Sequence, residues 1–143
     1  MFSKRSISGP VSATRYVTCA LLMIAHTAAA DELKPFTSDG CSAFPDGTPT
    51  QQELWLQCCT AHDRAYWAGG TYQQRLDADR ALRSCVEQVG EPEIAALMLV
   101  GVRVGGSLPT RFRWGYGWDW PRWYGPLSAD ELREVEAAAN AAQ

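Results

Sequence analysis

The chain has 143 residues, a length typical of one domain, with 46% hydrophobic residues and a formal net charge of −3. Three of the 13 basic residues and none of the 16 acidic residues precede position 31, so the remainder carries a net charge of −6 with histidine neutral. This acidic balance argues against nucleic acid as a partner and against capture by anionic lipid through charge alone.

Residues 1–30 have the layout of a cleavable secretory signal. Basic residues precede the apolar run YVTCALLMIA, and small residues follow it. The alternative is a membrane anchor, but the run is too short, because spanning a bilayer takes about 20 apolar residues. We therefore expect cleavage after Ala30 and a secreted or periplasmic domain of residues 31–143.

The chain after position 30 contains four cysteines: Cys41, Cys58, Cys59 and Cys85. An even number of cysteines in an exported chain indicates two disulfides, for which three pairings are possible. Zinc binding is the alternative, but adjacent cysteines do not match the usual spacing of zinc ligands. Two disulfides would also stabilise a domain whose hydrophobic core is modest in size.

The first segment of the exported chain, residues 31–47, is rich in Pro, Gly, Ser and Asp and predicts a loop. The sequence TPTQQELW is then expected to open a helix through a capping box, formed by Thr50 with Glu53 or, two residues earlier, by Thr48 with Gln51. The helix should continue through the paired cysteines and stop at the two glycines of WAGG.

Three further helices are expected, and no segment shows the alternation with period two that marks a strand. Glycines and a proline delimit the second and third helices of the chain, expected at residues 74–89 and 92–104. The last is expected in SADELREVEAAANAA, with Ser128 and Glu131 as its capping box. The first two helices of the chain are joined by a short connection and should therefore pack as antiparallel neighbours. The predicted fold class is all-α with long loops.

The segment 108–127 is too rich in glycine and tryptophan for a regular helix. Its aromatic rings and cations are Trp114, Trp118, Trp120, Trp123, Tyr116, Tyr124, Arg111, Arg113 and Arg122. Such rings beside cations suit a membrane interface, and they would equally suit a sugar-binding platform. The third interpretation is that they pack over the short core.

His62 is the only histidine after position 30. On a helix, Cys59, His62 and Tyr66 lie along one face at three- and four-residue spacing. A lone helical histidine is commonly a hydrogen-bonded core residue, so its neighbours decide whether it has a chemical role.

The register of the first two helices depends on how the cysteines pair. If Cys58 bonds Cys85, Asp79 lies near the level of His62, because four residues back along one helix cover about 6 Å and six residues forward along the other cover about 9 Å. A carboxylate there would fix the tautomer of the imidazole and stabilise its cation. The same pairing leaves the second adjacent cysteine for Cys41 and would draw the loop onto the first helix.

The sequence CCTAHDRAY resembles the active-site helix of the secreted phospholipase A2 family. That family's pattern is two cysteines, two residues, His-Asp and a tyrosine four residues after the histidine, which His62, Asp63 and Tyr66 match. The family's second long helix carries an aspartate with a cysteine six residues later, and Asp79 is placed in this way. Residues 91–143 have no counterpart in the pattern.

The loop SDGCSAFPDG is similar to the calcium loop of bacterial members of this family. There, an aspartate side chain and the next backbone carbonyl bind calcium together with the aspartate after the histidine. The resemblance, over residues 38–89, therefore implies a Ca²⁺ site at Asp39, the Gly40 carbonyl and Asp63, whose oxygens are the ligands that calcium prefers. The helix register and the resemblance agree on the disulfides Cys41–Cys59 and Cys58–Cys85.

The resemblance implies a phospholipase A2-like enzyme, a monomer that hydrolyses the sn-2 ester of a glycerophospholipid at a membrane or micelle surface. His62, held by Asp79, would take a proton from water, and Tyr66 would hydrogen-bond Asp79. Calcium would bind the phosphate and polarise the ester carbonyl. The apolar run IAALMLV suits a core, although a lipase also needs an apolar slot.

Two other classes remain open. The first is a phospholipase-like module that binds membrane lipid or glycan through the tryptophan-rich segment without catalysis. The second is a small structural protein stabilised by disulfides. The joint presence of His62, Asp63 and Asp79 favours the enzyme, because binding alone needs none of them.

Overall fold

The computed structural model describes residues 32–106, 113–119, 122 and 124–141. These residues form four helices and no strand: α1 (Leu56–Ala68), α2 (Tyr72–Gln88), α3 (Pro92–Gly105) and α4 (Ala129–Ala141). The expected all-α class is confirmed for this part of the chain. None of the helices found there is both long and apolar enough to cross a membrane. The predicted signal, residues 1–30, lies outside the described residues.

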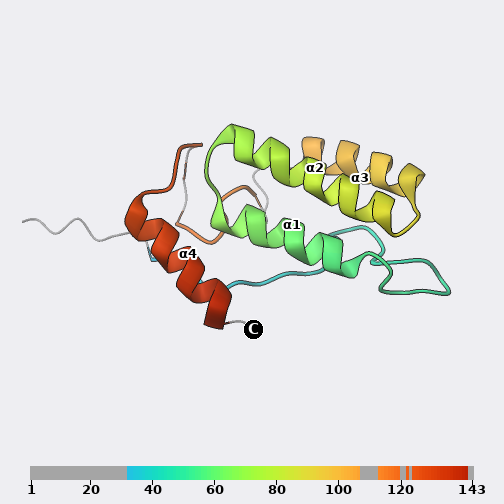
Figure 1. Cartoon of the computed structure of the whole chain (residues 1–143), viewed down its shortest axis with the longest axis horizontal. Coiled ribbons are helices and arrows are strands. Elements are labelled where there is room, and N and C mark those ends of the chain that lie inside the picture. Colours follow the sequence, from blue (N-terminus) through green and yellow to red (C-terminus); the bar gives the residue numbers. More distant parts are fainter. Residues whose placement is uncertain (1–31, 107–112, 120–121, 123, 142–143) are drawn as a thin grey trace, which may run out of the picture.

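α1 and α2 lie side by side and run in opposite directions (Figure 1). The disulfide Cys58–Cys85 joins the beginning of α1 to the last part of α2. At the other end of the pair, Tyr66 contacts Arg75, which lies in the first turn of α2. The short connection therefore produces the antiparallel pair that the sequence predicts.

α3 folds back on α2 and packs along it. The chain reverses direction at Gly90, whose φ of +96° lies in the left-handed region that glycine adopts without steric cost. Pro92 then occupies the first turn of α3, where its missing N–H leaves no hydrogen bond unmade. The predicted extent of this helix is confirmed.

The beginning of α1 differs from the prediction, because no helix starts at Thr50 and Glu53. Thr48 instead closes a turn with Gln51: the Gln51 N–H donates to the Thr48 hydroxyl (3.0 Å), and the Thr48 N–H donates to the Gln51 carbonyl (2.9 Å). This turn uses the groups that would have opened a helix. The chain becomes helical only at Leu56, without a side-chain cap.

Capping boxes begin α2 and α4. Thr71 and Gln74 form the box of α2, which was not predicted, so that helix begins two residues earlier than expected. For α4 the predicted box is confirmed: Ser128 N–H donates to the Glu131 carboxylate (2.6 Å), and Glu131 N–H donates to the Ser128 hydroxyl (3.3 Å).

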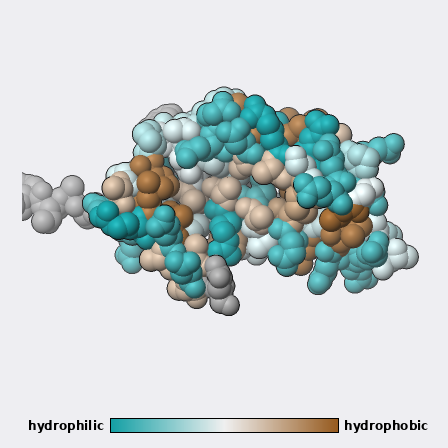
Figure 2. Space-filling view, in the orientation of Figure 1, coloured by the Kyte–Doolittle hydropathy of each residue, from teal (hydrophilic) through white to brown (hydrophobic). Residues whose placement is uncertain are grey.

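Two hydrophobic clusters hold the helices together. The first, between α1, α2 and α3, is formed by Trp55, Cys58, Cys59, Leu82, Val86, Ala95 and Met98. The second lies at the end of α1, where Val135 and Ala138 of α4 pack on Tyr66, Trp67, Trp114 and Tyr116. Figure 2 shows that the face formed by α1, α2 and α4 is largely hydrophilic, with apolar atoms in separate patches.

The described part of the tryptophan-rich segment is buried. Trp114, Tyr116 and Trp118 are at most 9% exposed. The indole N–H groups of Trp114 and Trp118 donate to the carbonyls of Gly70 (2.9 Å) and Ala68 (2.7 Å). These carbonyls lie at or just beyond the end of α1, where no further helical turn supplies an N–H to them. For these residues the interpretation as core packing is confirmed. Of the remaining predicted members, Arg111, Trp120 and Trp123 lie outside the described residues.

Candidate active site

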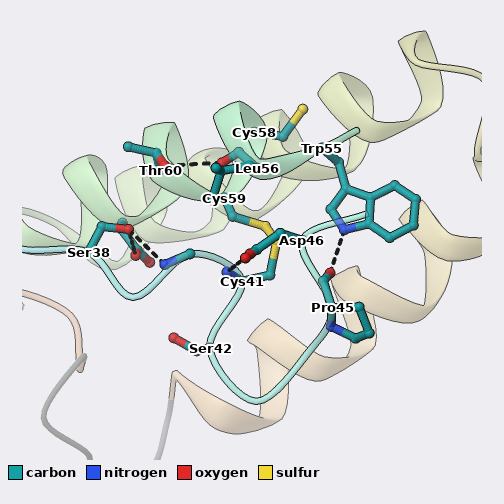
Figure 3. Close-up of a disulfide and its surroundings, with 12 residues drawn as sticks. Ser38, Cys41, Ser42, Pro45, Asp46, Trp55, Leu56, Cys58, Cys59 and Thr60 are labelled. Carbon is teal, nitrogen blue, oxygen red and sulfur yellow. Dashed lines mark hydrogen bonds between the residues drawn. A yellow bond between two sulfur atoms is a disulfide. The ribbon is translucent and has the colours of Figure 1, made fainter. Parts of the chain in front are cut away.

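Two disulfides fix the loop and both long helices around one region. Cys41 bonds Cys59 and Cys58 bonds Cys85, with Cα atoms 5.0 and 5.7 Å apart, both within the normal range. The predicted pairing is thus confirmed. Figure 3 shows the loop bound to α1 through Cys41–Cys59, so that Ser38 and Cys41 lie beside the helix that carries His62.

The structure brings His62, Asp79 and Tyr66 together, as the helix register predicts. His62 Nε2 lies 3.0 Å from Asp79 Oδ1, and the Tyr66 hydroxyl donates to the same oxygen at 2.8 Å. The side chain of Asp79 is 0% exposed and that of His62 is 8% exposed. The carboxylate is therefore held inside the fold.

The Asp79 carboxylate sets the tautomer of the neutral imidazole. Burial opposes its ionisation, but hydrogen bonds from His62 and Tyr66 outweigh burial and hold the pKa of Asp79 below its ordinary value. An ionised carboxylate only accepts hydrogen bonds, so Nε2 of neutral His62 carries the proton and Nδ1 keeps the lone pair. This is the tautomer that a general base requires.

Two arginines that were not predicted from the sequence complete this group. Arg103 of α3 forms an ion pair with Asp79, with Nε 2.9 Å from Oδ2, although the two groups are not aligned as a hydrogen bond. Arg75 is 2% exposed and donates from Nε to the Tyr66 hydroxyl at 3.0 Å. Arg75 could have been found, because it lies four residues before Asp79 on the same face of α2. Arg103 lies on a helix that the family pattern does not include.

Asp63 lies next to His62 in sequence but points elsewhere on α1, as the rotation of about 100° per residue requires. It is 6% exposed, and the Ser38 hydroxyl donates to its Oδ2 at 2.6 Å. Burial raises the pKa of Asp63 to about 6; Ser38 and His62 oppose the rise, and Asp39 adds to it. Negative charge at this position is therefore costly unless a cation accompanies it.

The loop that carries Asp39 and Gly40 is held in an unusual conformation. Gly40 has a φ of +76°, and a β-carbon there would lie 2.3 Å from Asp46 Oδ1, so only glycine fits. The same Asp46 oxygen accepts the Cys41 N–H at 2.8 Å (Figure 3). Asp39 is exposed and accepts the Ser42 hydroxyl at 2.6 Å.

A pocket of about 820 Å³ joins these groups. Five of the residues predicted for catalysis or metal binding line it: Asp39, Gly40, His62, Asp63 and Tyr66. The remaining wall is mostly apolar and includes Leu97, Met98 and Val100 of α3. The interpretation of IAALMLV as core is correct for Ala95 and Met98, which are buried, whereas Leu97 is 56% exposed at the pocket.

The ligand atoms of the predicted metal site are of the type that calcium prefers. The carboxylates of Asp39 and Asp63 and the carbonyl of Gly40 are hard oxygen ligands beside the same pocket. Across the described ranges no three His, Cys, Asp or Glu side chains converge as a metal site. The predicted site requires only two carboxylates, and Asp63 is the buried one whose charge a cation would offset.

The arrangement as a whole is a buried His–Asp pair with its ring at an apolar pocket and two carboxylates alongside. Such a site could activate water for attack on a substrate that is partly apolar and partly anionic. The assignment of catalytic and metal roles to these residues stays a prediction. Comparisons with protein-family models, with curated proteins and with solved structures found no match to this chain.

Proposed function

We propose that this protein is an exported, calcium-dependent hydrolase of the sn-2 ester of glycerophospholipids. The observation that supports it best is the 3.0 Å contact between His62 Nε2 and Asp79 Oδ1, made by a ring that lines an apolar pocket. A histidine that served only packing would need neither a buried carboxylate partner nor access to a cavity.

In the proposed reaction His62 is the general base. Nδ1 accepts a proton from a water molecule in the pocket as the oxygen of that water attacks the ester carbonyl. Asp79 stabilises the imidazolium that forms, and Tyr66 holds the carboxylate through the shared oxygen. The proton then passes from Nδ1 to the departing alkoxide oxygen, which leaves a free fatty acid and a lysophospholipid. No side chain becomes covalently bonded to the acyl group.

Asp39, the Gly40 carbonyl and Asp63 would hold the cation of this site. Calcium, when bound, supplies positive charge for the substrate phosphate and for the developing oxyanion. The protein's own contribution is to hold the loop rigid through Cys41–Cys59 and through the bond from Cys41 N–H to Asp46. A fixed loop lowers the entropy that ligand binding must overcome.

The pocket wall supports a lipid rather than a small polar ester. Leu97, Val100 and Val104 of α3 are more than half exposed, and all three line the pocket. Apolar side chains in this position would contact an acyl chain, with roughly 25 cal/mol gained for each Å² removed from water. The two disulfides suit an oxidising location, either secreted or periplasmic, and we expect a monomer.

The non-catalytic binding module is the weaker candidate. It would use the tryptophans, but Trp114 and Trp118 are buried and their N–H groups are bonded to backbone carbonyls. Neither ring is therefore available to grip lipid or glycan. That candidate also gives the His62–Asp79 contact no purpose.

The decisive experiment is an assay of residues 31–143 on mixed micelles of a phospholipid labelled in its sn-2 chain. We expect release of the labelled fatty acid with calcium and little release with excess chelator. Phospholipid labelled at sn-1 is the matched control and should release nothing. Binding to micelles without release of fatty acid would contradict the proposal and favour the binding module.

A further inference from the structure

α3 contributes a charged side chain to the buried end of the proposed active site. Arg103 Nε lies 2.9 Å from Asp79 Oδ2, while Oδ1 of the same carboxylate accepts from Tyr66 and lies against His62. Both oxygens of Asp79 are thus engaged, one by the imidazole and the phenol, the other by a cation. Asp79 is 0% exposed, so a charge partner is needed to offset the cost of burying it.

The end of α3 is fixed tightly against this group. The Arg103 guanidinium also donates from Nη2 to the Leu76 carbonyl at 3.0 Å, which spans from α3 to α2. In return, Arg75 donates from Nη2 to the Arg103 carbonyl at 3.1 Å. A β-carbon on Gly106 would lie 2.4 Å from the Tyr66 hydroxyl, so the backbone itself approaches the site closely. Arg103 is therefore held in place at both its backbone and its side chain.

Arg103 does not line the pocket, whereas its neighbours Val102 and Val104 do. Within the proposed site its contact is Asp79. A carboxylate held at only one oxygen can rotate, and rotation of Asp79 would misalign the ring that it orients. A cation on the second oxygen prevents that rotation.

We propose that Arg103 is a positioning residue that holds Asp79, and through it His62, in the geometry of the general base. The inference rests on the proposed function, since it deepens the account of the same site. It also extends that site to α3, a helix outside residues 38–89. The rate of hydrolysis would then depend on α3 through this ion pair and not through packing alone.

The first test compares Arg103→Gln with Arg103→Lys and with the control Arg83→Gln. Arg83 is also paired with a carboxylate, Glu87 at 2.7 Å, but on the exposed side of α2. Loss of a residue that supports a functional group costs roughly 10- to 100-fold in activity, so we expect that loss in kcat for Arg103→Gln with KM within about 3-fold. Arg103→Lys keeps the charge and should recover part of it, while Arg83→Gln should match wild type. Wild-type kcat in a folded Arg103→Gln variant would overturn the inference.

A double-mutant cycle tests whether Arg103 acts through Asp79. In an Asp79→Asn background the cation has no carboxylate to hold, so adding Arg103→Gln should lower kcat by less than about 3-fold. A loss as large as in the wild-type background would mean that Arg103 works by another route, and it would overturn the inference while leaving the proposed function intact.

A spectroscopic test does not depend on activity. In residues 31–143 His62 is the only histidine, so its imidazole ¹⁵N resonances are unambiguous. At a pH where the ring is neutral, wild type should show the Nε2–H tautomer, and Arg103→Gln should show a mixture of tautomers at a temperature where circular dichroism reports a folded chain. An unchanged tautomer would overturn the inference. If wild type hydrolyses no phospholipid, the proposed function fails, and this spectrum still decides the role of Arg103.

Discussion

At His62, the interpretations of the residue as a general base and as a core residue predict different mutants. The proposed metal ligands are oxygens, so His62→Gln should abolish hydrolysis, by at least about 100-fold, and leave calcium binding and melting temperature nearly unchanged. A core histidine would give the opposite result, a lower melting temperature with any activity spared. Calorimetry and the micelle assay on one preparation separate the two, and an active His62→Gln variant would rule out His62 as the general base.

Asp63 makes a prediction about pH and metal removal. The pKa of Asp63 is raised from 3.8 to about 6 in the folded protein, chiefly by burial. Between these values the folded state binds more protons than the unfolded state, so stability falls as pH rises through the window from about 4 to about 6. With calcium chelated, Asp63→Asn should escape this loss. Its free energy of unfolding, measured with urea at pH 7.5, should exceed that of wild type by up to about 3 kcal/mol.

Added calcium should reverse that order, because the cation stabilises wild type by binding to the ionised carboxylate, whereas the amide binds it poorly. An Asp63→Asn variant that gains as much stability from calcium as wild type does would remove Asp63 from the metal site.

Residue spacing predicted the His62–Asp79–Tyr66 group because all three lie on two helices joined by a short turn and a disulfide. Local periodicity and one cross-link are enough to fix that register. The same information does not reach Arg103, because its contact with Asp79 depends on how α3 packs on α2. That packing is set by tertiary contacts between residues that no spacing rule connects.

Among the helices, α3 is the element whose placement matters most for the site. Gly106 at its C-terminal end has an ordinary φ of −69°, so a side chain there meets only steric resistance. Its β-carbon would lie 2.4 Å from the Tyr66 hydroxyl and 2.8 Å from Arg75 Nη2. Gly106→Ala should therefore push α3 away, which lowers kcat and lowers the free energy of unfolding by roughly 1–3 kcal/mol as overpacked sites do.

Gly101→Ala is the matched control on the same helix. A β-carbon at Gly101 would meet nothing within 4 Å, so only helix propensity changes, and the variant should be more stable by up to about 1 kcal/mol. Urea unfolding of the two variants checks the signs. Equal stability of both variants would mean that α3 is not pressed against Tyr66 as the structure has it.

The helix ends show where sequence patterns compete. The Ser128–Glu131 box opens α4 as predicted, whereas the segment before α1 offers two overlapping boxes and uses neither to begin a helix. Trp55 is 3% exposed and donates its indole N–H to the Pro45 carbonyl at 2.7 Å. Burial of that large ring fixes the chain just before α1, and a tertiary gain of this size outweighs a local cap.

For the molecule as a whole, the two disulfides serve different purposes. Cys58–Cys85 fastens α1 to α2, whereas Cys41–Cys59 fastens the loop to α1. Their loops, with sequence separations of 18 and 27, predict similar losses of about 3 kcal/mol on removal of either bond, because the entropy of loop closure grows slowly with length. Stability alone therefore does not distinguish them.

Calcium binding should distinguish the two bonds. Replacing both Cys41 and Cys59 with serine frees the loop that carries Asp39 and Gly40, so calcium must order it again and its affinity should fall by roughly 10-fold or more. Replacing Cys58 and Cys85 leaves the loop fastened to Asp63's own helix, and a folded variant should keep near wild-type affinity. Isothermal titration with calcium at a temperature where both variants are folded measures the difference. Equal affinities would mean that the loop does not carry the metal ligands, and they would leave the His62–Asp79 pair to work with some other source of positive charge.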